Sequence, residues 1–135
     1  MKAVFADTFY WIAITLPSDP WAGRVAEVSE ALRTAHYVTT DEVLVEFLSH
    51  LSSKGERLRA LAVQLVRRIL QDEDITVIPQ SRESFLRGLD LYERRLDKGY
   101  SLIDCISMNA MWDGSITDVF SNDRHFEQEG FVSLV

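Results

Sequence analysis

Residues 2–9, KAVFADTF, decide the fold. The apolar run AVFA is short, and the polar residues Asp7 and Thr8 follow it at once. A run of this kind predicts a strand buried on both faces, as in parallel sheets. Ligands of open α/β sheets bind beside the carboxyl ends of the strands, which is where Asp7 falls. We therefore expect Asp7 either to cap the following helix or to hold a cation.

The composition is that of a globular protein. The chain has 135 residues, of which 47% are hydrophobic and 26% charged, so we expect a single domain over residues 1–135. No apolar run approaches the roughly 18 residues of a membrane span, and no membrane partner is expected. The N-terminus lacks the long apolar core of a signal peptide. The single cysteine, Cys105, cannot form an internal disulfide, and both features favour a cytoplasmic location.

The net charge limits how the chain could meet nucleic acid. A formal charge of −7 argues against a protein that grips nucleic acid through a broad basic face. It leaves open an enzyme whose acids surround metal ions, because bound cations reverse the local field.

Strand and helix patterns alternate along the chain. The expected strands are residues 3–6, 36–39, 75–78, 116–120 and 131–134. The expected helices are residues 8–16, 20–34, 40–53, 56–70, 82–97, 101–113 and 122–129. This alternation predicts an α/β domain with a mainly parallel central sheet of four to five short strands, flanked by helices.

Polar residues mark several helix starts. Thr8 is a plausible cap for the helix after the first strand. Thr39 with Glu42, and Ser101 with Asp104, each fit a capping box. These assignments give Asp104 a purely structural alternative to any role in a site.

Three further acids fall at places comparable to that of Asp7. Asp123 follows a strand, and Glu46 and Asp104 lie in early turns of helices. Each has a structural alternative: Asp104 completes a capping box, Asp123 could be a first-turn acid, and Glu46 lies beyond its helix's apolar stripe. Strand ends and the following helix starts share one edge of a parallel sheet, so the four acids could nevertheless converge.

A convergence of acids would require cations. Two carboxylates about 4 Å apart repel by about 4 kcal/mol at an effective dielectric constant near 20. Hard oxygen ligands of this kind suit Mg²⁺ or Mn²⁺.

Four motifs surround these acids: D-T-F-Y (residues 7–10), T-T-D-E-V-L-V-E-F (39–47), S-L-I-D-C-I-S (101–107) and S-N-D-R-H-F (121–126). They resemble the motifs of PIN-domain proteins, and in particular of the VapC-type toxins of bacterial toxin–antitoxin pairs. They occur in the family's order and at its spacing, and they cover essentially the whole chain. The resemblance implies a three-layer PIN-like fold.

The resemblance also implies an activity and partners. It implies an endoribonuclease dependent on Mg²⁺ or Mn²⁺, which hydrolyses RNA phosphodiester bonds through a metal-activated water. A cognate antitoxin and a homodimer are implied as partners. The implied catalytic and metal-binding acids are Asp7, Glu46, Asp104 and Asp123, with Thr8 and Ser121 or Asn122 as polar companions.

Other classes of protein fit the sequence less well. A haloacid-dehalogenase-like phosphatase needs a second Asp two residues after Asp7, where this chain has Phe9. A receiver domain needs its phosphoacceptor Asp at the end of the third strand, which here ends in Ile78. His125 could contact a substrate phosphate or be a surface histidine. The remaining alternative is a non-catalytic PIN-like binding module whose acids only cap helices.

Overall fold

The computed structural model describes residues 2–135, and a parallel sheet lies at its centre. The strands lie in the order β3-β2-β1-β4-β5, and each neighbouring pair is parallel. They are β1 (Ala3–Ala6), β2 (His36–Thr40), β3 (Ile75–Ile78), β4 (Asp118–Phe120) and β5 (Val132–Ser133). The expected sheet of four to five short, mainly parallel strands is confirmed.

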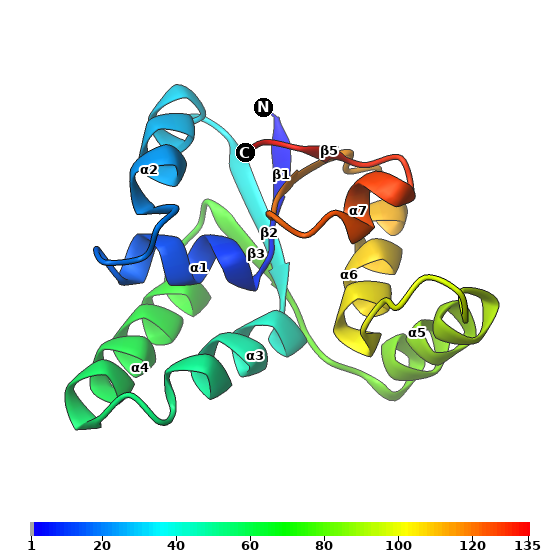
Figure 1. Cartoon of the computed structure of the whole chain (residues 1–135), viewed down its shortest axis with the longest axis horizontal. Helices are drawn as coiled ribbons and strands as arrows, with labels where there is room; N and C mark the ends of the chain where they lie inside the picture. Colours follow the sequence, from blue (N-terminus) through cyan, green and yellow to red (C-terminus); the bar gives the residue numbers. More distant parts are fainter. Residues whose placement is uncertain (1) are drawn as a thin grey trace.

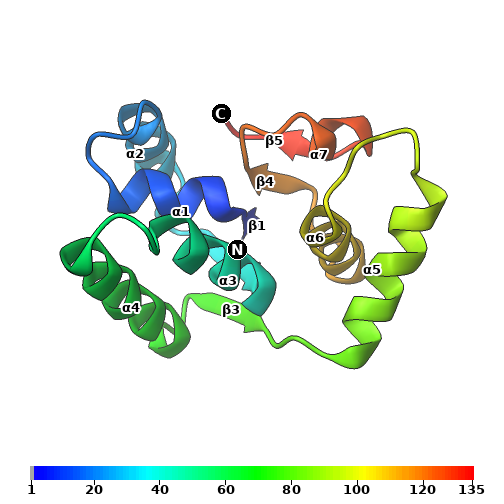
Figure 2. The ribbon, with the colours of Figure 1, turned by 60° about the horizontal axis from the view of Figure 1, so that its bottom comes forward.

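Helices cover both faces of this sheet. In Figure 1, α1 to α4 lie to the left of the strands and α5 to α7 to the right, and Figure 2 shows the same division. The sheet is therefore the middle of three layers. The helices are α1 (Thr8–Thr15), α2 (Ala22–Ala31), α3 (Asp41–Leu51), α4 (Glu56–Gln71), α5 (Arg82–Arg94), α6 (Leu102–Asp113) and α7 (His125–Gln128).

The central strand β1 pairs with β2 on one side and with β4 on the other. Val4, Phe5 and Ala6 are fully buried, as expected for a strand covered on both faces. The backbone N–H of Asp7 donates to the carbonyl of Phe120, 3.2 Å away. Asp7 is thus held at the point where β1 and β4 both end.

The capping box expected at Thr39 is wrong by one residue. The strand β2 continues through Thr40, whose hydroxyl accepts a hydrogen bond from the Val43 N–H at 3.1 Å and caps α3. Thr39 is completely buried instead. Its hydroxyl donates to the Ala6 carbonyl at 2.9 Å and lies 3.4 Å from the indole Nε1 of Trp11.

The second expected capping box is confirmed. The Ser101 hydroxyl accepts from the Asp104 N–H, and the Asp104 carboxylate accepts from the Ser101 N–H, so α6 begins as predicted. Behind it α6 packs closely on α5 at Gly88, where an added Cβ would come within 2.6 Å of the Ile106 side chain. The absence of a side chain at Gly88 therefore lets α5 support the helix that carries Asp104.

Other helix starts also differ from the expectation. Asp7, and not Thr8, occupies the N-cap position of α1, although its side chain makes no capping bond. The α2 helix begins only at Ala22, because the Asp19 carboxylate accepts from the Trp21 N–H and holds a turn before it. The last helix, α7, begins at His125, three residues later than expected.

The predicted absence of a membrane-spanning segment can be checked over part of the chain. Within residues 2–135, no helix has both the length and the apolar composition needed to cross a bilayer.

The buried hydroxyl of Thr39 gives a first prediction. Thr39→Val keeps the side-chain volume but removes the bond to the Ala6 carbonyl and leaves the Trp11 N–H without its acceptor. We expect it to lower the free energy of unfolding by about 1–3 kcal/mol in chemical denaturation. Thr76→Val, at an exposed position of the neighbouring strand β3, is the control and should cost much less. Equal losses in the two variants would contradict this account of Thr39.

Candidate active site

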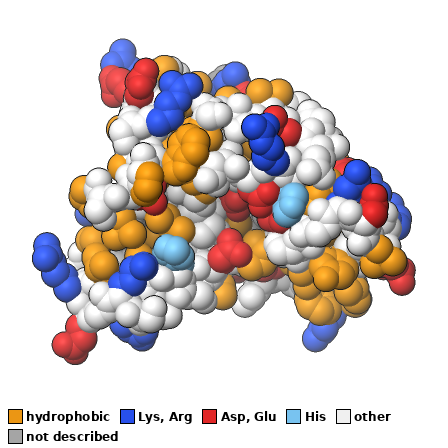
Figure 3. Space-filling model, viewed as in Figure 1, with side chains coloured by type: hydrophobic (Ala, Val, Ile, Leu, Met, Phe, Trp, Pro, Cys, Tyr) orange, Lys and Arg blue, Asp and Glu red, His pale blue; other side chains and the backbone are white. Residues whose placement is uncertain are grey.

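The carboxyl edge of the sheet brings together segments that are far apart in the sequence. α1 follows β1, α3 follows β2, and the loop before α7 follows β4, so all three begin at this edge. The space-filling view in Figure 3 shows acidic side chains grouped near the centre of the molecule, in a hollow between the two layers of helices, with a histidine beside them. This grouping is where the four acids were expected to converge.

Asp7 is deeply buried, with 8% of its surface exposed, the same fraction as Asp104. Its Oδ2 accepts a hydrogen bond from the hydroxyl of Ser121 at 2.9 Å. Burial raises the pKa of Asp7 from 3.8 to about 7. The Thr8 backbone N–H and the Ser121 hydroxyl act in the opposite direction, whereas the nearby charges of Asp104 and Glu46 raise the pKa further. The ionised form of Asp7 is therefore poorly solvated in the metal-free protein.

A buried acid outside this group, Asp118, has a cationic partner that Asp7 lacks. Asp118 in β4 is equally buried, and its carboxylate pairs with the Lys2 ammonium at 2.7 Å. Among the residues that the structure describes, no Lys, Arg or His forms an ion pair with Asp7. A buried carboxylate without such a partner either takes up a proton or requires a cation from outside the chain.

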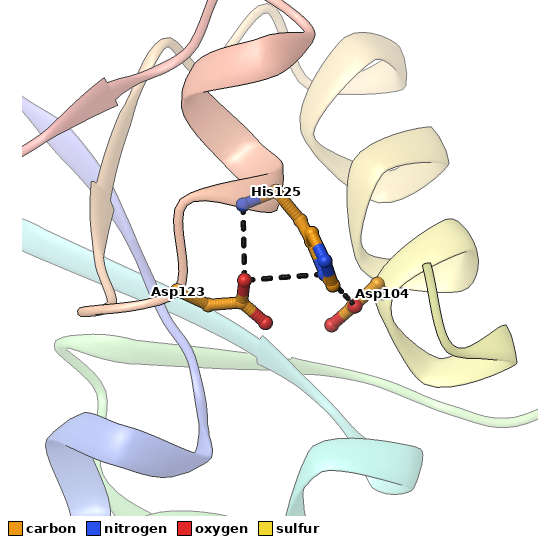
Figure 4. Close-up of side chains that lie close together, drawn as sticks. All are labelled: Asp104, Asp123 and His125. Atoms are coloured by element: carbon orange, nitrogen blue, oxygen red, sulfur yellow. Dashed lines mark hydrogen bonds and ion pairs between the residues drawn. The ribbon is translucent and has the colours of Figure 1, made fainter. Parts of the chain in front are cut away.

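Asp104 and Asp123 meet on the other side of the site, together with His125. Figure 4 shows Asp104 on α6, Asp123 in the loop after β4 and His125 at the start of α7. The imidazole Nδ1 lies 3.0 Å from Asp104 Oδ2 and 3.1 Å from Asp123 Oδ1. Ligand atoms of these three side chains all lie within 4.8 Å of one another, which is close enough for them to share an ion.

Both carboxylates keep an oxygen available for such an ion. Asp104 Oδ2 accepts from the Ser101 N–H, and Asp123 Oδ1 accepts from the His125 N–H. Within residues 2–135, the second oxygen of each carboxylate has no hydrogen-bond donor. Carboxylate oxygens that are fixed on one side and open on the other suit a hard divalent cation. The residues present therefore fit Mg²⁺ or Mn²⁺.

The polar companions divide into those that contact the acids and one that does not. Thr8 donates its hydroxyl to Glu46 Oε1 at 2.5 Å, and Glu46 is partly buried on α3. Ser121 is completely buried. Besides donating to Asp7, its hydroxyl accepts from the Asp123 N–H at 3.0 Å, so it joins two of the acids. Asn122 is exposed, and in the described part of the chain its side chain makes no hydrogen bond to these acids.

The fold and this acidic edge define a known class of protein. A family model described as the PIN domain matches residues 4–131. The chain therefore belongs to the PIN-domain family, and the resemblance drawn from its motifs is confirmed at that level.

Among solved structures, the crystal structure of VapC20 from Mycobacterium tuberculosis, described as a toxin that cleaves the sarcin–ricin loop, is similar. The TM-score is 0.83 and the sequence identity 23%, over 96% of this chain and 96% of that one. The likeness establishes the shared fold. A sequence comparison with curated proteins returns no match.

Sequence reasoning did not assign His125 to the acid cluster. His125 was expected to contact a substrate phosphate or to be a surface histidine; its ring is partly exposed and contacts two of the four acids. The available signal was the spacing D-x-H just after a strand, since side chains two positions apart can approach one another where a turn leads into a helix.

The pKa of Asp7 leads to a prediction about metal-free stability. The folded-state pKa of about 7 lies above the ordinary 3.8, so this group favours the folded state most below pH 3.8, and the contribution is lost as the pH rises through 7. One pKa unit is worth about 1.4 kcal/mol, which sets the penalty at pH 8 at up to about 4 kcal/mol. Asp7→Asn should remove it. In EDTA, the variant should therefore unfold at higher denaturant than the wild type at pH 8, with a smaller difference at pH 5.

Asp118→Asn is the matched control for this experiment. It also neutralises a buried acid, but one whose cation is Lys2, so it should give no gain in stability at pH 8. A gain from Asp7→Asn that is the same at pH 5 and pH 8 would show that the charge of Asp7 is not the cause.

Proposed function

We propose that this PIN-domain protein is an endoribonuclease that requires Mg²⁺ or Mn²⁺ and acts as the toxin of a toxin–antitoxin pair. The observation that carries the proposal is the buried Asp7 carboxylate, which has no cation of its own among residues 2–135 and lies beside other acids at the carboxyl edge of the sheet. Further support comes from the family membership and from the likeness in fold to a ribonuclease toxin.

The acids have distinct tasks in this proposal. Asp7 and Asp104 are the core metal ligands, and Asp123 and Glu46 complete the site directly or through water molecules. Ions held there stabilise negative charge on a phosphoryl group and lower the pKa of bound water, which is the chemistry of phosphodiester hydrolysis. The reaction needs no covalent intermediate with the protein.

Neighbouring polar groups fix the acids in place. The Ser121 hydroxyl orients Asp7 while it holds the backbone of Asp123, so these two acids keep a constant separation. The Thr8 hydroxyl orients Glu46 in the same way. Hydroxyl groups that position carboxylates reduce the reorganisation needed when a phosphodiester arrives.

We propose a cytoplasmic location, a cognate antitoxin and a homodimer as the setting of this activity. Support for protein partners comes from the outer face of α5, which carries large apolar side chains that are exposed in the single chain. These are Phe85, Leu86, Leu89 and Tyr92, with Leu96 just beyond the helix. Exposed apolar groups on one helix face are typical of protein interfaces.

Cleavage of RNA by the purified protein tests the proposal. We expect cleavage with Mg²⁺ or Mn²⁺ and none in excess EDTA. Ca²⁺, whose coordination is looser, should support RNA binding better than hydrolysis. Without divalent ions, the net charge of −7 should make RNA binding weak. Asp7→Asn should lower the cleavage rate by more than about 100-fold, since it removes a metal ligand and not merely a supporting group.

Two controls separate catalysis from folding and from contamination. Asp118→Asn changes a buried acid at the start of β4, at the other end of this strand from the acids of the site. The variant should cleave RNA like the wild type if it folds. Expression of the wild type, but not of Asp7→Asn, should arrest growth of a host that lacks the antitoxin. Full cleavage in EDTA, or full activity of Asp7→Asn, would refute the metal-nuclease mechanism. No cleavage with any of these ions would favour a non-catalytic binding module whose acids only cap helices.

A further inference from the structure

We propose that His125 is a positioning residue, which sets the separation of Asp104 and Asp123 by donating its Nδ1–H to Asp104 while the same ring nitrogen lies against the Asp123 carboxylate. The inference rests on the proposed function, because it assigns His125 a role in preparing the metal site. It concerns the ring of His125 and not the four acids implied by the family motifs.

The direction of the hydrogen bond between His125 and Asp104 supports this role. Ionised carboxylates only accept hydrogen bonds, so the ring nitrogen that is hydrogen-bonded to Asp104 Oδ2 at 3.0 Å must carry the hydrogen; Asp123 Oδ1 lies 3.1 Å from the same nitrogen. A neutral imidazole with its hydrogen on Nδ1 satisfies this condition. The same ring atom contacts both acids, which therefore cannot move apart without losing the hydrogen bond to Asp104 or the close approach to Asp123.

The His125 ring contacts the carboxylate oxygens that already face the protein backbone. Nδ1 approaches Asp104 Oδ2 and Asp123 Oδ1, the same two oxygens that accept from backbone N–H groups. The ring thus adds to the contacts on the protein side of each carboxylate. The ring does not contact the other oxygen of either carboxylate, which remains open to an ion (Figure 4). A direct metal ligand would be expected on the open side.

The His125 ring is itself held in place by its neighbours. The Tyr100 ring packs against the imidazole, with their centroids 5.0 Å apart. The Tyr100 hydroxyl donates to Glu129 at 2.8 Å, and Arg95 donates to both oxygens of Glu129 at 2.9 and 3.0 Å. This series of contacts ties the end of α5 and the start of α6 to the end of α7. His125 is therefore fixed from behind, as a group that positions metal ligands needs to be.

The chain offers a matched pair of substitutions at this position. Asn carries its side-chain nitrogen at the same distance from Cβ as Nδ1 of histidine, whereas the nitrogen of Gln corresponds more closely to Nε2. His125→Asn should therefore preserve much of the hydrogen bond to Asp104 and of the contact with Asp123, and His125→Gln should lose them. His50→Asn and His50→Gln, at an exposed histidine on α3, control for the loss of an imidazole as such.

Metal affinity is the first measurement, made by calorimetric titration of each variant with Mn²⁺. We expect His125→Gln to bind Mn²⁺ about 10- to 100-fold more weakly than the wild type, the usual effect of losing a group that orients metal ligands. His125→Asn should recover most of this loss, and both His50 variants should match the wild type. Equal affinities of His125→Gln and the wild type, or no recovery in His125→Asn when that variant is folded, would overturn the inference.

Two spectroscopic readouts separate positioning from ligation. In the metal-free protein, ¹⁵N NMR of the imidazole should find the hydrogen on Nδ1, and a bare Nδ1 would refute the inference. In the Mn²⁺-loaded protein, pulsed EPR should lack the ¹⁴N coupling of a directly bound imidazole, and its presence would show that His125 is a ligand instead. If the wild type binds no Mn²⁺ at all, the proposed function itself fails, whereas an unchanged His125→Gln beside a wild type that binds refutes only the inference.

Discussion

The charge of one buried carboxylate is the constraint on which the site depends. Asp7 ends the central strand, is almost inaccessible to water and receives no cation from the described part of the chain. A hydroxyl from Ser121 and the N–H of Thr8 cannot replace the solvation that a charged carboxylate loses on burial, and the pKa rises accordingly. Binding of a divalent ion would displace the proton, so metal binding, proton release and folding stability are coupled at this residue.

The topology explains how such an unfavourable group is assembled. Placing β1 between β2 and β4 forces the segments that follow these strands to one edge, and the parallel direction brings their first polar residues close together. Asp104 reaches the same place on α6, whose packing against α5 requires the close approach at Gly88. The apolar core beneath the edge, with Val4, Phe5 and Phe120 fully buried, supplies the stability that offsets the repulsion among the acids.

Local patterns in the sequence predict much of this arrangement, whereas the rest depends on contacts between residues far apart in the chain. The strands β1 and β3 and the Ser101–Asp104 capping box are set by runs of a few residues, which the sequence displays directly. The shift from Thr39 to Thr40 as the helix cap depends on Ala6, which lies 33 residues away and takes the Thr39 hydroxyl. Likewise, the contact of His125 with Asp104 spans 21 residues, so no helix or strand periodicity could indicate it.

The two interpretations of Asp104, as a helix cap and as a site residue, turn out to be compatible because a carboxylate has two oxygens. The capping bond from Ser101 uses Oδ2, and so does His125, which leaves Oδ1 without a hydrogen-bond donor among residues 2–135. Capping alone does not demand a carboxylate, since α5 begins with an equivalent capping box that uses the neutral Ser84 at the same position. An Asn at position 104 could also cap the helix, but its second polar atom would be a hydrogen-bond donor and would repel a cation. The charge at position 104 is thus the part of this residue that the helix does not require and a metal site does.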